Sequence, residues 1–360
     1  KLAWKWRLLL LSLIKRLSIF VFILCLFTSC STRIESEVYN PHSLDQMKAL
    51  EDWKITTLIA KGDQEKSRPE PYVVDGLSDG DKLLLLSGSG KESQIDVDGE
   101  SVEIYNLLLG ESYSWTVSDD SGKSIKEGKF IVSQDPPRNL YIDGVTNVRD
   151  LGGWIGENGE RIKQGLVYRS ARLNENESKK TLLTEKGRKA LASLEIKSEI
   201  DLRKIVDNEN GGLTESPIGE GVDYYSIPFE TGGGYLQKNL SSFPALFKVL
   251  GDEDNYPLLF HCSIGTDRTG AVSFVLLSLL SVSEDDLYRD YLFSNFGYIE
   301  GIRRKSAIDD YLLFIERYQG ETRKEKVYSM LIDNGVEKKD IDSFISIMTD
   351  NDYLSIGERI

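Results

Sequence analysis

Residues 258–270 read Leu-Leu-Phe-His-Cys-Ser-Ile-Gly-Thr-Asp-Arg-Thr-Gly. The apolar run from Leu258 to Phe260 predicts a buried strand, and the apolar stretch after Thr269 predicts a helix. The loop between them begins with Cys262 and carries Arg268 six positions later. Such a strand, loop and helix points backbone N–H groups and a helix N-terminus into one concavity, which makes a cradle for an anion.

The side chains of this loop suit phosphoryl chemistry. A positive cradle lowers a thiol pKa, so we expect Cys262 to be a thiolate nucleophile. Arg268 offers a planar fork for two phosphoryl oxygens. Thr269 can donate a hydrogen bond to the sulfur and help it leave. The rest of the cradle, and substrate binding, are expected from Ser263, Ile264, Gly265 and Thr266.

The chain around the loop alternates between two kinds of pattern. Strand-like apolar runs lie at Leu166–Tyr168, Ile196–Leu202, Tyr224–Ile227 and Leu258–Phe260. Helical periodicity appears at Thr184–Leu194, Phe243–Leu250, Thr269–Leu280, Glu284–Phe293, Ala307–Tyr318, Lys324–Asn334 and Asp340–Met348. Because strands and helices interleave, residues 135–360 are predicted to form an α/β domain with a mostly parallel sheet flanked by helices.

The loop, with His261 before it and Gly270 after it, resembles the signature of the protein tyrosine phosphatase superfamily. Four more blocks resemble bacterial tyrosine phosphatases whose loop reads His-Cys-x-x-Gly-Lys-Asp-Arg-Thr-Gly: Asn147–Gly153, Tyr168–Ala171, Asp201–Arg203 and Asp290–Asn295. The likeness spans about Asn139 to Met348. It implies hydrolysis of phosphotyrosine, for some members also of phosphoserine or phosphoinositides, through a cysteinyl phosphate and without metal or other cofactor. The family's loop lysine is Thr266 here.

The leaving oxygen needs an acid, because a tyrosine phenolate has a conjugate pKa near 10. The resemblance favours Asp267, which is inside the loop; Asp201 is the alternative, at the end of a predicted strand. Each could instead be structural, Asp267 at a helix N-terminus and Asp201 beside an arginine. His261 is expected to orient the loop and tune the thiolate. Arg149 could line the pocket or only hold a local ion pair.

Alternatives to hydrolysis differ in how much of the loop they explain. A buried core cysteine would leave Arg268 and the loop glycines unexplained, and the blocks upstream disfavour a rhodanese-like sulfur transferase. A catalytically weak phosphate-binding module, or an inositide phosphatase, stays open. The formal net charge of -14 opposes binding to nucleic acid. With two histidines and no clustered cysteines a His/Cys metal site is improbable, although a carboxylate site for Mg²⁺ or Ca²⁺ stays open.

The first thirty residues have the composition of a signal peptide. Basic residues precede the apolar run Leu17–Phe27, and Thr28-Ser29-Cys30 follows. This ending resembles a loosened bacterial lipobox, which implies acylation of Cys30 and a lipid-anchored protein of the bacterial cell envelope. A membrane span, disfavoured by Lys15 and Arg16 near its middle, and plain secretion are the alternatives. Residues 31–50, polar and unpatterned, are expected to be a tether.

Residues 51–134 predict a small all-β sandwich, because short runs alternate with clusters of Gly, Asp and Ser. Within it, Asn106–Val117 resembles a corner of fibronectin type III domains, where a tyrosine such as Tyr113 bonds back across the turn. The pair Pro136-Pro137 marks the boundary with the α/β domain. Since no catalytic constellation appears before it, a spacer or docking module is expected.

Overall fold

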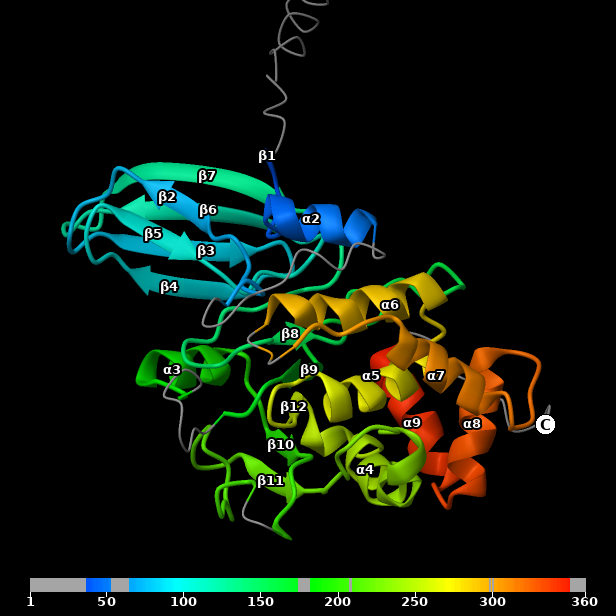
Figure 1. Ribbon diagram of the computed structural model, residues 1–360. Coiled ribbons are helices and arrows are strands. Elements are labelled where there is room, and N and C mark those ends of the chain that lie inside the picture. Colours follow the sequence, from blue (N-terminus) through cyan, green and yellow to red (C-terminus); the bar gives the residue numbers. More distant parts are fainter. Residues whose placement is uncertain are drawn as a thin grey trace, which may run out of the picture. The chain divides into compact units, whose positions relative to one another are not determined.

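The computed structural model of the protein describes residues 37–52, 65–173, 182–206, 209–297, 299 and 301–349 (Figure 1). The predicted signal peptide and lipobox, Cys30 included, lie outside these residues. Among the helices of the described part, none combines the length and the apolar character that crossing a bilayer needs.

The predicted α/β domain is built on a five-stranded sheet with the order β11-β10-β12-β9-β8. The strands are β8 (Arg149–Asp150), β9 (Val167–Ser170), β10 (Ser198–Asp201), β11 (Asp223–Ser226) and β12 (Leu258–His261). The neighbours from β11 to β9 are parallel, and β8 is antiparallel to β9. The prediction of a mostly parallel sheet is therefore confirmed.

Helices cover both faces of this sheet, and Figure 1 shows α3 on one side of the strands and α4 and α5 on the other. The helices are α3 (Glu185–Ser193), α4 (Phe243–Leu250), α5 (Asp267–Leu279), α6 (Glu284–Phe293), α7 (Ser306–Ile315), α8 (Arg323–Asp333) and α9 (Lys338–Met348). Successive strand residues point to opposite faces. Accordingly, Leu258 and Phe260 belong to one core cluster and Leu259 to another. Burial on both faces explains why β12 is apolar throughout.

The N-terminal part contains one five-stranded sheet, β1-β7-β6-β3-β4, and a two-stranded sheet, β2-β5. The strands are β1 (Glu37–Tyr39), β2 (Tyr72–Asp75), β3 (Lys82–Ser87), β4 (Glu92–Asp96), β5 (Ser101–Ile104), β6 (Ser112–Ser118) and β7 (Ser124–Val132). Both sheets contribute to one apolar cluster. The hydroxyl of Tyr113 accepts a hydrogen bond from the backbone N–H of Leu108 at 3.0 Å, which is the bond predicted across this corner.

The segment expected to be a tether is folded from Glu37 onward. Besides β1 it contains helix α2 (Leu44–Glu51), whose N-terminus has a capping box between Ser43 and Gln46. The Gln46 side chain is buried and donates to the carbonyl oxygens of Lys66 and Arg68 at 2.7 and 2.9 Å. The sequence does not predict this helix, because hydrogen bonds, and not an apolar stripe, hold it in place.

The predicted boundary at Pro136-Pro137 is crossed by a buried side chain. Arg138 donates to the backbone carbonyl oxygens of Leu107 and Asn106 at 2.9 and 2.7 Å. It also forms an ion pair with Asp150 at 2.7 Å. The side chain of Arg138 therefore bonds to residues on both sides of the predicted boundary.

Candidate active site

The candidate site lies where three parallel strands end. Asp201 of β10 is in register with His261 of β12, and His261 with Ser170 of β9. The chain then turns through residues 262–266 into helix α5. Gly265 adopts a φ of +69°, and a Cβ atom there would lie 2.4 Å from the carbonyl oxygen of Ser170. Glycine is thus required both by the backbone conformation and by the close approach of the two chains.

Cys262 is buried, with 2% of its surface exposed. Burial alone would raise the pKa of its thiol, but the charge of Arg268 and hydrogen bonds from Thr269 lower the pKa below its ordinary value. The Thr269 hydroxyl is buried and forms no hydrogen bond with an oxygen or nitrogen atom of the described residues. It can therefore donate its hydrogen bond to the sulfur of Cys262. These three residues are brought together as the sequence predicted.

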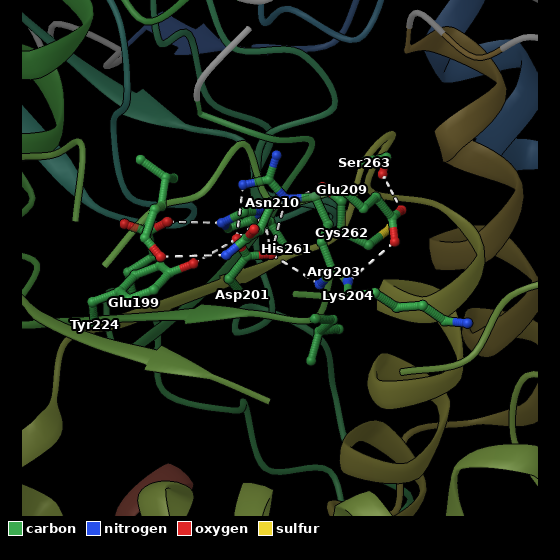
Figure 2. A network of polar contacts seen from close by, with 12 residues as sticks. Glu199, Asp201, Arg203, Lys204, Glu209, Asn210, Tyr224, His261, Cys262 and Ser263 are labelled. Carbon is green, nitrogen blue, oxygen red and sulfur yellow. Dashed lines mark hydrogen bonds and ion pairs between the residues drawn. The ribbon is translucent and has the colours of Figure 1, made fainter. Parts of the chain in front are cut away.

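The guanidinium of Arg268 is bound to the carboxylate of Glu209, a residue that was not predicted to belong to the site. Its two terminal nitrogens donate to the two oxygens of Glu209 at 3.0 and 2.5 Å. The Ser263 hydroxyl donates to the same carboxylate at 2.8 Å (Figure 2). Burial would raise the pKa of Glu209, yet the hydrogen bonds from Arg268 lower it to about 2. Glu209 therefore occupies the fork expected to hold a phosphoryl group; it follows β10 in a polar loop, where no motif marks it.

Behind Cys262, His261 is fully buried between two carboxylates (Figure 2). Its Nε2 lies 2.8 Å from Glu199, and its Nδ1 lies 3.2 Å from the carbonyl oxygen of Cys262 and 3.9 Å from Asp201. Burial would lower the pKa of His261, but Asp201 and Glu199 raise it. Both ring nitrogens thus face acceptors, which suits a protonated ring that fixes the backbone of Cys262.

Glu199, Asp201 and His261 also form the group of potential metal ligands found in the described part of the chain. Their atoms are engaged with one another and with neighbours. Arg203 donates to both oxygens of Asp201 at 2.9 and 2.7 Å, and the Tyr224 hydroxyl donates to it at 2.9 Å. The group is therefore an internal ion-pair network.

The two acid candidates have different surroundings. Asp201 is fully buried; burial would raise its pKa, but His261 and Arg203 lower it. Asp267 is the first residue of α5, and its side chain is 15% exposed. Arg303 donates to both of its oxygens at 2.7 and 2.8 Å, and the Tyr291 hydroxyl lies 3.4 Å away. Of the two carboxylates, Asp267 is the one that a bound substrate could reach.

A buried group of two arginines and one aspartate supports the loop from beneath. Arg149 and Arg169 pair with the two oxygens of Asp290 at 2.9 and 2.5 Å. Arg169 also donates to the carbonyl oxygen of Gly265 at 2.9 Å, and Asn147 donates to the same oxygen at 3.0 Å. Arg149 is fully buried, so it belongs to this support and not to the pocket wall that was one expectation for it. Two cations for one anion leave a positive charge beneath the cradle.

Thr266 also faces the protein. It is fully buried, and its hydroxyl donates to the carbonyl oxygen of Ile264 at 3.3 Å and accepts from Asn147 at 3.4 Å. Thr266 was expected to contact the substrate, but its side chain is buried inside the protein and cannot do so. A lysine at this position could not simply add a cation to the cradle.

Known proteins with similar sequences are tyrosine phosphatases. A sequence profile described as "Tyrosine phosphatase family" matches residues 140–323. The chain belongs to this family. It is 31% identical to a protein named as a tyrosine-protein phosphatase in Cupriavidus necator, over 44% of this chain and 63% of that one. It is also 31% identical to a tyrosine-protein phosphatase of Nostoc commune, over 33% and 47% of the two chains. The chain thus spans about half to two thirds of the length of these relatives.

Two solved structures resemble part of this tyrosine phosphatase family member. The core catalytic domain of the PP-IP phosphatase SIW14 from S. cerevisiae, solved with citrate, matches 45% of this chain and 94% of its own, with 16% identity and a TM-score of 0.28. A second structure of the Siw14 catalytic core matches 47% and 89%, with 18% identity and a TM-score of 0.31.

Proposed function

We propose that the protein is a cysteine-dependent phosphomonoester hydrolase whose preferred substrates are phosphotyrosine proteins. The observation that carries this proposal is the buried Cys262: burial would raise the pKa of its thiol, but Arg268 in the first turn of α5 lowers it. Membership of the tyrosine phosphatase family supports the same activity. A thiolate and a bidentate cation at one cradle are what in-line attack on phosphorus requires.

In the proposed reaction, Cys262 attacks phosphorus and forms a cysteinyl phosphate while the tyrosine oxygen leaves. Arg268 holds two of the three phosphoryl oxygens, and the backbone N–H groups of the loop from Ser263 to Thr266 bind around the group as well. Asp267 protonates the leaving oxygen and then takes a proton from the water that hydrolyses the intermediate. Thr269 stabilises the sulfur as it leaves. Glu209 must release Arg268 before the phosphoryl group can bind.

The test of this proposal is turnover of p-nitrophenyl phosphate in the presence of EDTA. Cys262→Ser is expected to abolish turnover but to keep measurable binding of vanadate. Turnover by this variant within about tenfold of wild type would refute the nucleophile assignment. Arg268→Lys should also be severe, because an ammonium cannot reproduce a bidentate fork.

An inositol phosphate or phosphoinositide is the second candidate substrate. The burial of Thr266 bears on it, because a compact polyanion needs a cation beside the cradle and this loop position supplies none. Comparing kcat/KM for a phosphotyrosine peptide with that for inositol phosphates distinguishes the two classes. A preference for the inositol phosphates would overturn our ranking.

We further propose a lipid anchor at Cys30 that holds the protein at the bacterial cell envelope, with the fibronectin-like β-sandwich as a spacer or docking module. The proposal rests on the sequence of the first thirty residues and on the corner at Tyr113. Cys30→Ala should abolish labelling by a fatty-acid analogue. Undiminished labelling would rule the anchor out.

A further inference from the structure

Residues far upstream of the predicted domain boundary are connected to the catalytic loop. Residues 38–52 and 65–70, which we call the N-terminal segment, belong to the compact unit that runs from Val38 to Ile360. The proposed reaction uses none of them. Their buried polar groups nevertheless form a chain of hydrogen bonds that ends at the loop.

Asn147 is the residue through which the segment reaches the loop. It is 1% exposed, and its side chain donates to the carbonyl oxygens of Ile264 and Gly265 at 3.1 and 3.0 Å. A peptide unit is planar and trans, so its N–H points opposite to its carbonyl group. With these two carbonyl groups turned toward Asn147, the N–H groups of Gly265 and Thr266 point away from it. Asn147 therefore sets the direction of two donors of the anion cradle.

The backbone of Asn147 is held by Ser67. Asn147 has a φ of +57°, in the left-handed region that residues other than glycine adopt infrequently, so its conformation needs support from its surroundings. Its N–H donates to the hydroxyl of Ser67 at 3.3 Å, and Ser67 is 3% exposed. Without this hydroxyl, the N–H of a buried residue would lose its acceptor. Ser67 thus stabilises the backbone conformation from which the Asn147 side chain reaches the loop.

Ser67 is fixed in its turn by helix α2 and by the catalytic domain. The buried Gln46 of α2 donates to the carbonyl oxygens of Lys66 and Arg68, on either side of Ser67. The backbone N–H of Lys66 donates to the carbonyl oxygen of Phe296, in the 3₁₀ turn after α6, at 2.8 Å. Hydrogen bonds on both sides therefore keep Ser67 opposite Asn147.

A second contact joins the segment to the support of the loop. Arg289 of α6 donates to the carbonyl oxygen of Leu50 of α2 at 2.8 Å. The next residue, Asp290, pairs with the two arginines beneath the loop. One of these, Arg169, binds the same carbonyl oxygen of the loop as Asn147 does. The segment thus contacts both structures that hold this carbonyl group, Asn147 directly and Arg169 through α6.

We propose that Ser67 is a positioning residue for the catalytic loop, acting through Asn147, and that Gln46 holds Ser67 in place. This role rests on the proposed function, because the loop that Ser67 positions is the one that binds the phosphoryl group. The N-terminal segment then contributes to catalysis indirectly, by fixing the direction of the loop N–H groups. It is a part of the active-site structure and not only a connection to it.

The first experiment replaces Ser67 by alanine in the full chain. In Ser67→Ala, kcat for p-nitrophenyl phosphate and the affinity for vanadate should each fall about tenfold, because misdirected N–H groups bind the transition state less well. The matched control is Ser87→Ala. Ser87 is also buried, and its hydroxyl accepts from the backbone N–H of Lys91 at 2.9 Å within the β-sandwich. Kinetic constants of the two variants that agree within about twofold would overturn the proposal.

The reactivity of Cys262 is a readout that a loss of stability alone would not change in the folded protein. Alkylation by iodoacetamide at neutral pH, followed at the peptide that contains Cys262, should slow by more than about threefold in Ser67→Ala, since the thiolate depends on correctly placed loop groups. In Ser87→Ala the rate should equal that of wild type.

The contribution of Gln46 is tested by a double-mutant cycle. Gln46→Leu should lower kcat by about fivefold, and the double variant with Ser67→Ala should lose no more than the worse single variant, because both act through one contact. Losses that multiply would refute the role of Gln46.

Failure of the proposed function gives a different result. If wild type does not hydrolyse p-nitrophenyl phosphate, the proposed function fails. The role of Ser67 is then judged by alkylation of Cys262, where equal rates in Ser67→Ala and Ser87→Ala overturn it.

Discussion

Replacing Glu209 by glutamine should strengthen phosphate binding. The carboxylate of Glu209 occupies both terminal nitrogens of Arg268, so a substrate has to displace it from the cation that binds the phosphoryl group. An amide of the same shape keeps the hydrogen-bonding oxygen but loses the negative charge. We therefore expect Glu209→Gln to release Arg268 more readily.

The size of the effect follows from the electrostatics of Glu209. A pKa of about 2, against an ordinary value of 4.5, corresponds to at most about 3.4 kcal/mol of preference for the ionised form. Part of this comes from Ser263 and the backbone of Lys204, and the side chain is 28% exposed, so solvent screens it. Taking about half leaves about 1.5 kcal/mol, or about a tenfold decrease in KM.

The assay measures KM and kcat for p-nitrophenyl phosphate and the inhibition constant of vanadate. In Glu209→Gln, KM and the inhibition constant of vanadate should both fall. The control Glu220→Gln, at an exposed residue, should match wild type in both constants. The effect should persist at all working pH values, because Glu209 remains ionised until the pH approaches about 2. A lower kcat with an unchanged or higher KM would refute competition and show that Glu209 holds Arg268 in position.

The other predictions concern the acid, the loop and its support. Asp267→Asn should reduce kcat by about 10²–10⁴ for alkyl phosphates, less for phosphotyrosine and least for p-nitrophenyl phosphate; equal losses across that series would mean that another group donates the proton. Gly265→Ala should abolish activity and lower the free energy of unfolding by more than about 2 kcal/mol, since its Cβ would meet the Ser170 carbonyl; full activity would show that the loop can move. Asp290→Asn should cost about 3–5 kcal/mol in denaturant unfolding because it leaves two buried arginines unpaired, whereas Asp309→Asn, at an exposed ion pair with Lys305, should cost less than about 1 kcal/mol. Burial would raise the pKa of Asp290 but the two arginines lower it, so its stabilising contribution should be present above the ordinary range of an aspartate and fade only at more acidic pH.

The sequence predicted the α/β domain closely because its elements have strong periods and clear ends. The predicted helices Phe243–Leu250 and Glu284–Phe293 match α4 and α6 to the residue. Each begins at a recognisable signal, a proline in the first turn of α4 and a serine cap before α6. For these two helices, residues close in the sequence were sufficient to predict where the helix begins and ends.

Contacts between side chains far apart in the sequence could not be predicted from the sequence alone. Glu209 and Arg303 contact the loop from 59 and 36 residues away, and nothing in their own neighbourhood marks them. Arg149 has a recognisable motif around it, yet only the fold reveals that Asp290, 141 residues later, holds it beneath the cradle. For the same reason residues 31–50 were predicted to be a tether, because the partners of Gln46 are backbone groups of distant residues.

Cys262 is the free cysteine of the described residues, and its environment also has a consequence for oxidation. A thiolate reacts with peroxide far faster than a thiol does, and the first product is a sulfenic acid. Since no second cysteine stands near Cys262 in the described part of the chain, an internal disulfide cannot trap that product there. Recovery would then depend on an external thiol, or on condensation with a backbone nitrogen of the loop, and further peroxide would inactivate the protein for good. The activity of the protein would therefore depend on the oxidants that reach Cys262.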